Sequence, residues 1–141
     1  MATFLYGSAS QNFGTGAWDW PSLTIGALLV SGVYVPRPNT DTYVSDIPPS
    51  SLVARSDQND GGGDMTSMSM TNGVAYGLIP QFDALISTVP VVALVLFVDT
   101  GTDSTSSLIY YSSDGAGFPF TPQGFNYYIA PDSGLGGWFQ T

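Results

Sequence analysis

The sequence predicts an all-β, single-domain fold: a sandwich or jelly-roll-like barrel of about seven to nine short antiparallel strands. Three observations favour it. The 141 residues include 17 Gly and 10 Pro, which break helices, and neither Glu nor Lys, which favour them. Three Trp, eight Tyr and eight Phe favour strands. Short apolar runs also alternate with turn residues at intervals of about 8–12 residues. One domain is expected to span residues 1–141.

The first residues, about 1–19, are expected to form an extended arm with a Gly-rich loop rather than regular structure. The segment lacks the cationic start and long apolar core of a secretory signal.

The centre of the predicted sheet is a hairpin over residues 89–111. Residues 91–98 are uncharged and rich in Val, and their length suits a strand that is buried on both faces. Residues 99–107 have turn chemistry, and residues 108–111 return to β-branched and aromatic side chains. Further strands are expected at residues 23–30, 33–35, 52–55, 65–70, 74–79, 125–130 and 135–139, with residues 118–122 as an edge.

Local signals refine this pattern. Asn72-Gly73 is the strongest hairpin turn in the chain. Gly26, inside an apolar run, indicates a bulge or a close approach of backbone. Residues 36–49 contain four prolines, which exclude a central strand, and they can hold one helical turn capped by Thr40 or Asp41.

Charge excludes several classes of function. Only 9% of the residues are charged, and the net charge is −9. The two cations are Arg37 and Arg55, so there is no basic cluster for nucleic acid or for anionic membranes. No apolar run is long enough to span a membrane. A surface with so few charges favours extensive contact with other protein, and we expect a homo-oligomer.

Composition also limits catalysis. The chain has no His, Cys, Lys or Glu, so the Ser-His and Cys-His arrangements are impossible, and no enzymatic activity, cofactor or metal is expected. Two carboxyls remain the one available acid–base pair. Asp99 and Asp103 flank the central turn, where shaping the turn is their simplest role and metal binding the alternative.

An acidic stretch, residues 57–64, has oxygen ligands beside glycines but fails the EF-hand spacing, since its twelfth position is Met68. It is either a solvated loop or a non-standard calcium site.

The aromatic residues allow two interpretations: a platform that stacks on sugar rings, or rings that fill a core or a protein interface. The candidates for the platform are Trp18, Trp20, Trp138, Tyr110, Tyr111, Tyr127 and Tyr128.

Several segments resemble, in order and spacing, small structural proteins of tailed-bacteriophage virions. They are residues 28–29, 34–36, 41–42 and 44–48, then the apolar run at 91–98, residues 99–103 and residues 108–111. The resemblance implies a non-enzymatic virion protein, and decoration or cement on the capsid fits it best. It implies no catalytic residues.

The sequence therefore leads to one principal expectation and one alternative. The first is a capsid decoration protein, located in the virion, that stabilises contacts between major capsid subunits or other virion proteins. The alternative is a carbohydrate-binding module of a tail or fibre. The residues expected at the interface are Phe4, Tyr6, Phe13, Trp18, Trp20, Arg37, Tyr43, Trp138 and Phe139.

Overall fold

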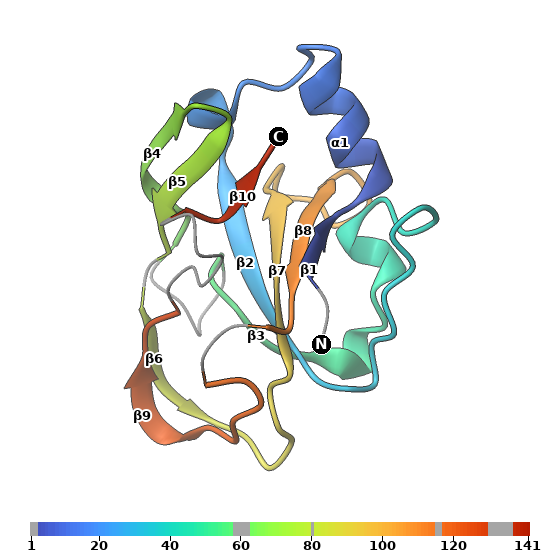
Figure 1. Cartoon of the computed structure of the whole chain (residues 1–141). Coiled ribbons are helices and arrows are strands. Elements are labelled where there is room, and N and C mark those ends of the chain that lie inside the picture. The colour runs from blue at the N-terminus through green and yellow to red at the C-terminus, as the bar shows by residue number, and fades with distance from the viewer. Residues whose placement is uncertain (1–2, 58–62, 80, 115–116, 130–136) are drawn as a thin grey trace.

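The protein folds as a sandwich-like all-β structure with three antiparallel sheets and one short α-helix (Figure 1). The computed structural model describes residues 3–57, 63–79, 81–114, 117–129 and 137–141. The fold class predicted from the sequence is confirmed in its sandwich-like form, and the sheets do not close into a barrel. The described residues contain ten strands, where about seven to nine were expected. No helix in the described ranges has the length and apolar character needed to cross a membrane.

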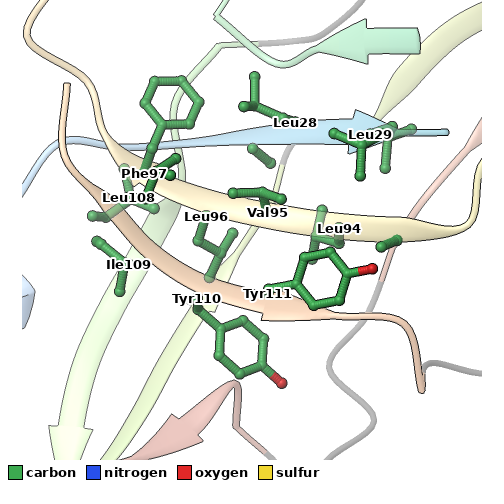
Figure 2. Close-up of a cluster of buried hydrophobic side chains, with 14 of the residues drawn as sticks. Leu28, Leu29, Leu94, Val95, Leu96, Phe97, Leu108, Ile109, Tyr110 and Tyr111 are labelled. Carbon is green, nitrogen blue, oxygen red and sulfur yellow. The ribbon is translucent and has the colours of Figure 1, made fainter. Parts of the chain in front are cut away.

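The largest sheet has five strands in the order β1-β8-β7-β2-β3. Its members are β1 (Thr3–Leu5), β2 (Ile25–Val30), β3 (Leu52–Arg55), β7 (Ala93–Val98) and β8 (Leu108–Ser112). Strands β2 and β7 lie at its centre and pair along their full length, from Ile25 opposite Val98 to Val30 opposite Ala93. The predicted central hairpin is thus confirmed as β7 and β8. Figure 2 shows the apolar side chains that these strands contribute to the core.

Gly26 lies where β2 approaches a ring of β7. A Cβ at this position would lie 2.5 Å from Cζ of Phe97, which is fully buried. The glycine is therefore required because the Phe97 ring occupies the space of a side chain; the sequence predicted a bulge or a close approach of backbone instead.

Two smaller sheets flank the first. Strands β4 (Thr66–Thr71), β5 (Val74–Leu78) and β10 (Phe139–Gln140) form one, in the order β10-β5-β4. The predicted turn at Asn72-Gly73 joins β4 to β5, and both residues have the positive φ angles that such a turn needs. Strands β6 (Phe82–Ile86) and β9 (Gln123–Tyr127) form the other.

The expected extended arm with a Gly-rich loop is wrong at residues 7–14. Residues Gly7–Gly14 form helix α1, which lies beside β8 (Figure 1). Its residues are poor helix formers, so packing rather than intrinsic propensity explains the helix. Tyr6 and Ala9 are fully buried, and the Tyr6 N–H donates to the Ile109 carbonyl at 2.9 Å. Before the helix, Thr3–Leu5 form the extended strand β1.

Three short 3-10 turns lie in the described part of the chain. They span Trp20–Ser22, Val44–Asp46 and Pro49–Ser51. The helical turn predicted within residues 36–49 is present at Val44–Asp46, but Asp46 caps it by accepting from the N–H groups of Thr42 and Tyr43. Residues 33–35 form no strand, and residues 118–122 contribute a single bridge, from Phe120 to Val91.

We predict that Gly26→Ala lowers the free energy of unfolding by about 1–3 kcal/mol, because the added methyl group displaces the buried Phe97 ring. Urea denaturation measures the change. Gly14→Ala is the matched control, since a Cβ there meets nothing within 4 Å. Equal stability of the two variants would contradict this account of Gly26.

Candidate functional site

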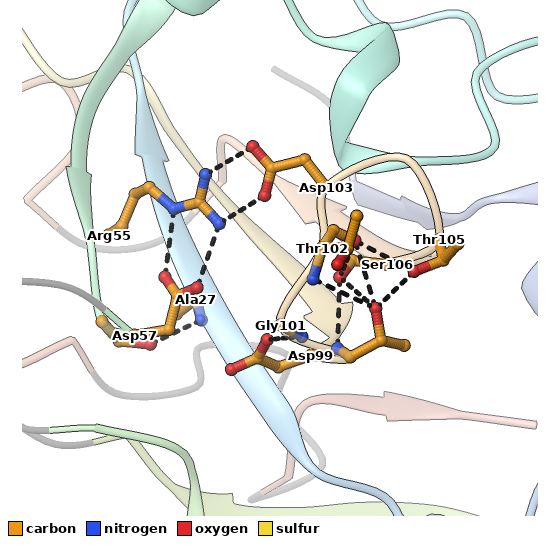
Figure 3. Close-up of polar contacts among 11 residues, drawn as sticks. Ala27, Arg55, Asp57, Asp99, Gly101, Thr102, Asp103, Thr105 and Ser106 are labelled. Atoms are coloured by element: carbon orange, nitrogen blue, oxygen red, sulfur yellow. Dashed lines mark hydrogen bonds and ion pairs between the residues drawn. The ribbon is translucent and has the colours of Figure 1, made fainter.

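The loop between β7 and β8 contains the two aspartates that the sequence singled out (Figure 3). Asp99 Oδ1 accepts a hydrogen bond from the Gly101 N–H at 2.9 Å, so its predicted role in shaping the turn is confirmed. The hydroxyls of Thr100 and Ser106 lie 3.1 Å apart and brace the loop from inside.

Asp103 instead forms a bidentate ion pair with Arg55, at 2.9 Å for both hydrogen bonds. The same guanidinium binds Asp57 at 3.0 Å through two further bonds, and it lies 5.7 Å from the centre of the Phe97 ring. The hydrogen bonds from Arg55 hold the pKa of Asp103 below its usual range. Four hydrogen bonds from the guanidinium go to Asp57 and Asp103, so Arg55 joins β3 to the β7–β8 loop as a clamp (Figure 3).

The Arg55 clamp was missed in the sequence. Arg55 and Asp103 are 48 residues apart, and no local pattern joins them. The signal that could have found it is the rarity of cations, because a lone arginine in a buried strand needs a carboxylate partner.

Asp64 and Asp99 form a contact between two carboxyl groups. Burial, followed by the hydrogen bond and charge of Asp99, raises the pKa of Asp64 to about 6. Asp64 Oδ1 is buried and has no hydrogen-bond partner. Within the described residues no three acidic side chains converge closely enough to hold a metal ion. The alternative of a calcium site concerned residues 57–64. Of these, residues 58–62 lie outside the described residues, and Asp57 already binds Arg55.

We predict that Asp64→Asn stabilises the protein at pH 7–8. The folded-state pKa of about 6 exceeds the value of about 3.9 in an unfolded chain, so the folded state binds more protons between these values. Stability therefore falls as the pH rises through this window, and the variant avoids the loss. Its advantage over the wild type should shrink towards pH 4, as measured by urea denaturation at a series of pH values. Asp83→Asn removes the same charge from an exposed position and serves as the control for the change in net charge.

The nine residues expected at an interface divide by burial. Tyr6, Trp20, Trp138 and Phe139 are buried in the protein's own core, so their assignment to a surface is wrong. The indole N–H groups of Trp20 and Trp138 donate to the carbonyls of Tyr76 and Gly77. These contacts also remove both rings from the proposed sugar platform.

Phe4, Phe13 and Trp18 are half-buried. Phe4 stacks on Tyr111 with ring centres 5.1 Å apart, and Phe13 meets Trp18 edge to face at 5.4 Å. Phe13 also lines a pocket of about 340 Å³ between α1 and β10. The other lining residues are Leu5, Ser10, Gly14, Gln140 and Thr141, whose side chains include no acid or base.

Arg37 and Tyr43 remain exposed, and both belong to residues 31–49, which we call the Asp41 loop. Asp41 is buried and holds the loop from inside. Its Oδ2 accepts hydrogen bonds from the Tyr34 hydroxyl at 2.9 Å and the Arg37 N–H at 3.0 Å, while its Oδ1 accepts from Arg37 Nη2 at 3.0 Å. The Tyr34 and Tyr6 hydroxyls lie 2.7 Å apart. This network ties the loop to the start of α1, and burial raises the pKa of both tyrosines.

Backbone bonds secure the loop at further points. The Gly7 N–H donates to the Pro38 carbonyl at 2.8 Å, and the Val44 N–H donates to the Ser106 carbonyl at 2.9 Å. The Asp41 loop is thus attached to α1 on one side and to the β7–β8 loop on the other.

Large apolar side chains lie on the outer surface of the Asp41 loop. Val33 and Val35 are 61% and 74% exposed, and the exposed Tyr43 ring and Arg37 side chain follow them. Tyr and Arg are the side chains that contribute most at protein interfaces. A rigid loop that presents them loses little conformational freedom on binding. The arrangement is suited to contact with another protein rather than to a reaction.

No family model, no curated protein and no solved structure matches this chain.

We predict that Tyr34→Phe lowers the free energy of unfolding by about 1–3 kcal/mol, because the buried Asp41 carboxylate loses a donor that water cannot replace. Thermal and urea denaturation measure the loss. Tyr128→Phe removes an exposed hydroxyl and should leave stability unchanged. If the two variants matched, the network would not be what holds the loop.

Proposed function

We propose that this protein is a non-enzymatic structural component of a virus particle, a decoration protein that binds between major capsid subunits through the Asp41 loop. The observation that carries the proposal is the exposure of Val33, Val35 and Tyr43 on a loop fixed from inside by buried hydrogen bonds. Such a surface can bury apolar area against a partner at about 25 cal/mol per Å² before the cost of association.

Two features of the sequence support the proposal. The chain lacks His, Cys, Lys and Glu, which restricts the catalytic groups it can use. Binding through apolar and aromatic side chains does not need these residues. The first segments that resemble phage structural proteins, within residues 28–48, fold into β2 and the Asp41 loop. Part of the resemblance therefore falls on the Asp41 loop, and the rest falls on the buried strands of the central sheet and the β7–β8 loop.

A binding experiment with particles tests the proposal. Capsids stripped of the protein should recover it on mixing and should then release their genome at a higher temperature. Val33→Asp with Val35→Asp should abolish this recovery, because two charges are placed in an apolar contact. Co-sedimentation and a thermal release assay measure the two effects.

Leu78→Asp is the matched control, since it places a charge on an exposed apolar residue of β5 outside the loop. The control should bind as the wild type does. Capsids with equal thermal stability with and without the protein would contradict a decorating role.

A further inference from the structure

The pocket between α1 and β10 has the dimensions of a small-molecule site. Its volume is about 340 Å³, and the two elements that border it lie in the upper half of Figure 1. Leu5 and Phe13 give it an apolar wall. The polar side chains in the lining belong to Ser10, Gln140 and Thr141. An apolar wall with a few polar groups is typical of pockets that bind small organic molecules.

The aromatic part of the wall is held in place by its neighbours. Trp18 meets the Phe13 ring edge to face with ring centres 5.4 Å apart, and the buried Phe139 ring lies 5.6 Å away at an angle of 50°. Neither ring is parallel to Phe13, which is half-buried and lines the pocket. The wall is therefore formed before a ligand arrives, and little conformational freedom is lost on binding.

The polar side of the pocket is anchored through β10. Gln140 Nε2 donates to the Asn72 carbonyl at 3.3 Å, and the Thr141 N–H donates to the Gly73 carbonyl at 2.8 Å. An amide oxygen accepts hydrogen bonds, and a hydroxyl both donates and accepts them. The Gln140 amide and the Ser10 and Thr141 hydroxyls therefore offer a ligand donors and acceptors together.

The charge of the lining selects a neutral ligand. None of the side chains that line the pocket is charged, although the chain has a net charge of −9. An anion, a nucleotide included, would be repelled by the molecule and would find no cation in the lining, because both arginines bind aspartates elsewhere. A cation would find no carboxylate side chain to compensate its lost hydration.

Two classes of neutral ligand fit the lining poorly. A purely apolar molecule would displace water from three polar side chains without replacing the hydrogen bonds. A peptide that extended the sheet would need a longer edge than β10, which has two residues. A sugar ring has an apolar C–H face that can stack on Phe13, and hydroxyl groups around its edge that donate and accept.

We propose that this pocket binds a neutral saccharide, with a sugar ring against Phe13 and sugar hydroxyls bonded to Ser10, Gln140 and Thr141. Phe13 was not among the aromatic residues from which the sequence predicted a sugar platform. The site arises where α1 and β10, from opposite ends of the chain, come together. No residue of its lining belongs to the Asp41 loop, so it is independent of the proposed contact with a capsid.

An NMR titration of the isotope-labelled chain tests the proposal, with glucose, galactose, maltose and lactose as the probes. At about 10 mM sugar, a site with a Kd of about 1 mM is about 90% occupied. At least one of these sugars should shift the amide signals of residues 10–14 and 139–141, and the shift should saturate. Toluene, as an apolar probe of similar ring size, should cause no saturable shift there.

Two variants connect the binding to the pocket. Gln140→Ala should weaken binding of that sugar by about 3–10-fold, because the hydrogen bonds of the amide are lost. Gln11→Ala is the matched control, since it removes the same amide from an exposed position of α1 outside the lining. Gly14→Leu should abolish binding by filling the pocket, and a Cβ at this position displaces no atom within 4 Å.

The proposal would be overturned by the lack of a saturable shift with all of these sugars, or by shifts confined to residues outside the lining. Equal binding by Gln140→Ala and Gln11→Ala would overturn it as well, and shifts with toluene alone would make the pocket an apolar site. Val33→Asp with Val35→Asp, which tests capsid binding, should bind the sugar as the wild type does. The two proposals can therefore fail separately.

Discussion

The structure depends on the pairing of β2 with β7. Both strands are uncharged and buried on both faces, so each side of the sheet has to be covered by other parts of the chain. The close contact of Gly26 with Phe97 shows how tightly the two strands pack. Because both faces of this sheet have to be shielded from water, aromatic residues near both termini, such as Tyr6 and Trp138, lie in the core rather than on the surface.

Ion pairs stabilise the loops around the same central sheet. The chain has two cations, and both bind aspartate: Arg55 holds Asp57 and Asp103, and Arg37 holds Asp41. In each case the ion pair fixes a loop beside the central sheet. Because the Asp41 carboxylate and the Arg55 guanidinium are themselves largely buried, removing their partners would leave a poorly compensated charge at each. A small number of ion pairs thus secures the connections on which the exposed surfaces stand.

The exposed residues of the Asp41 loop depend on this scaffold. Hydrogen bonds to the buried Asp41 carboxylate fix the Asp41 loop. Val35 and Tyr43 of the same loop are exposed to water.

The sequence by itself determined what depends on near neighbours. The apolar run of β7, the Asn72-Gly73 turn and the Asp99 turn were all predicted, because each is specified within a few residues. Helix α1, the Arg55 clamp and the burial of Trp138 were not. Those features join residues far apart in the chain, such as Trp138 and Gly77, which are 61 positions apart. Tertiary structure alone decided which aromatic side chains cover the sheet and which remain exposed, because burial depends on the segments that surround a residue and not on its own type.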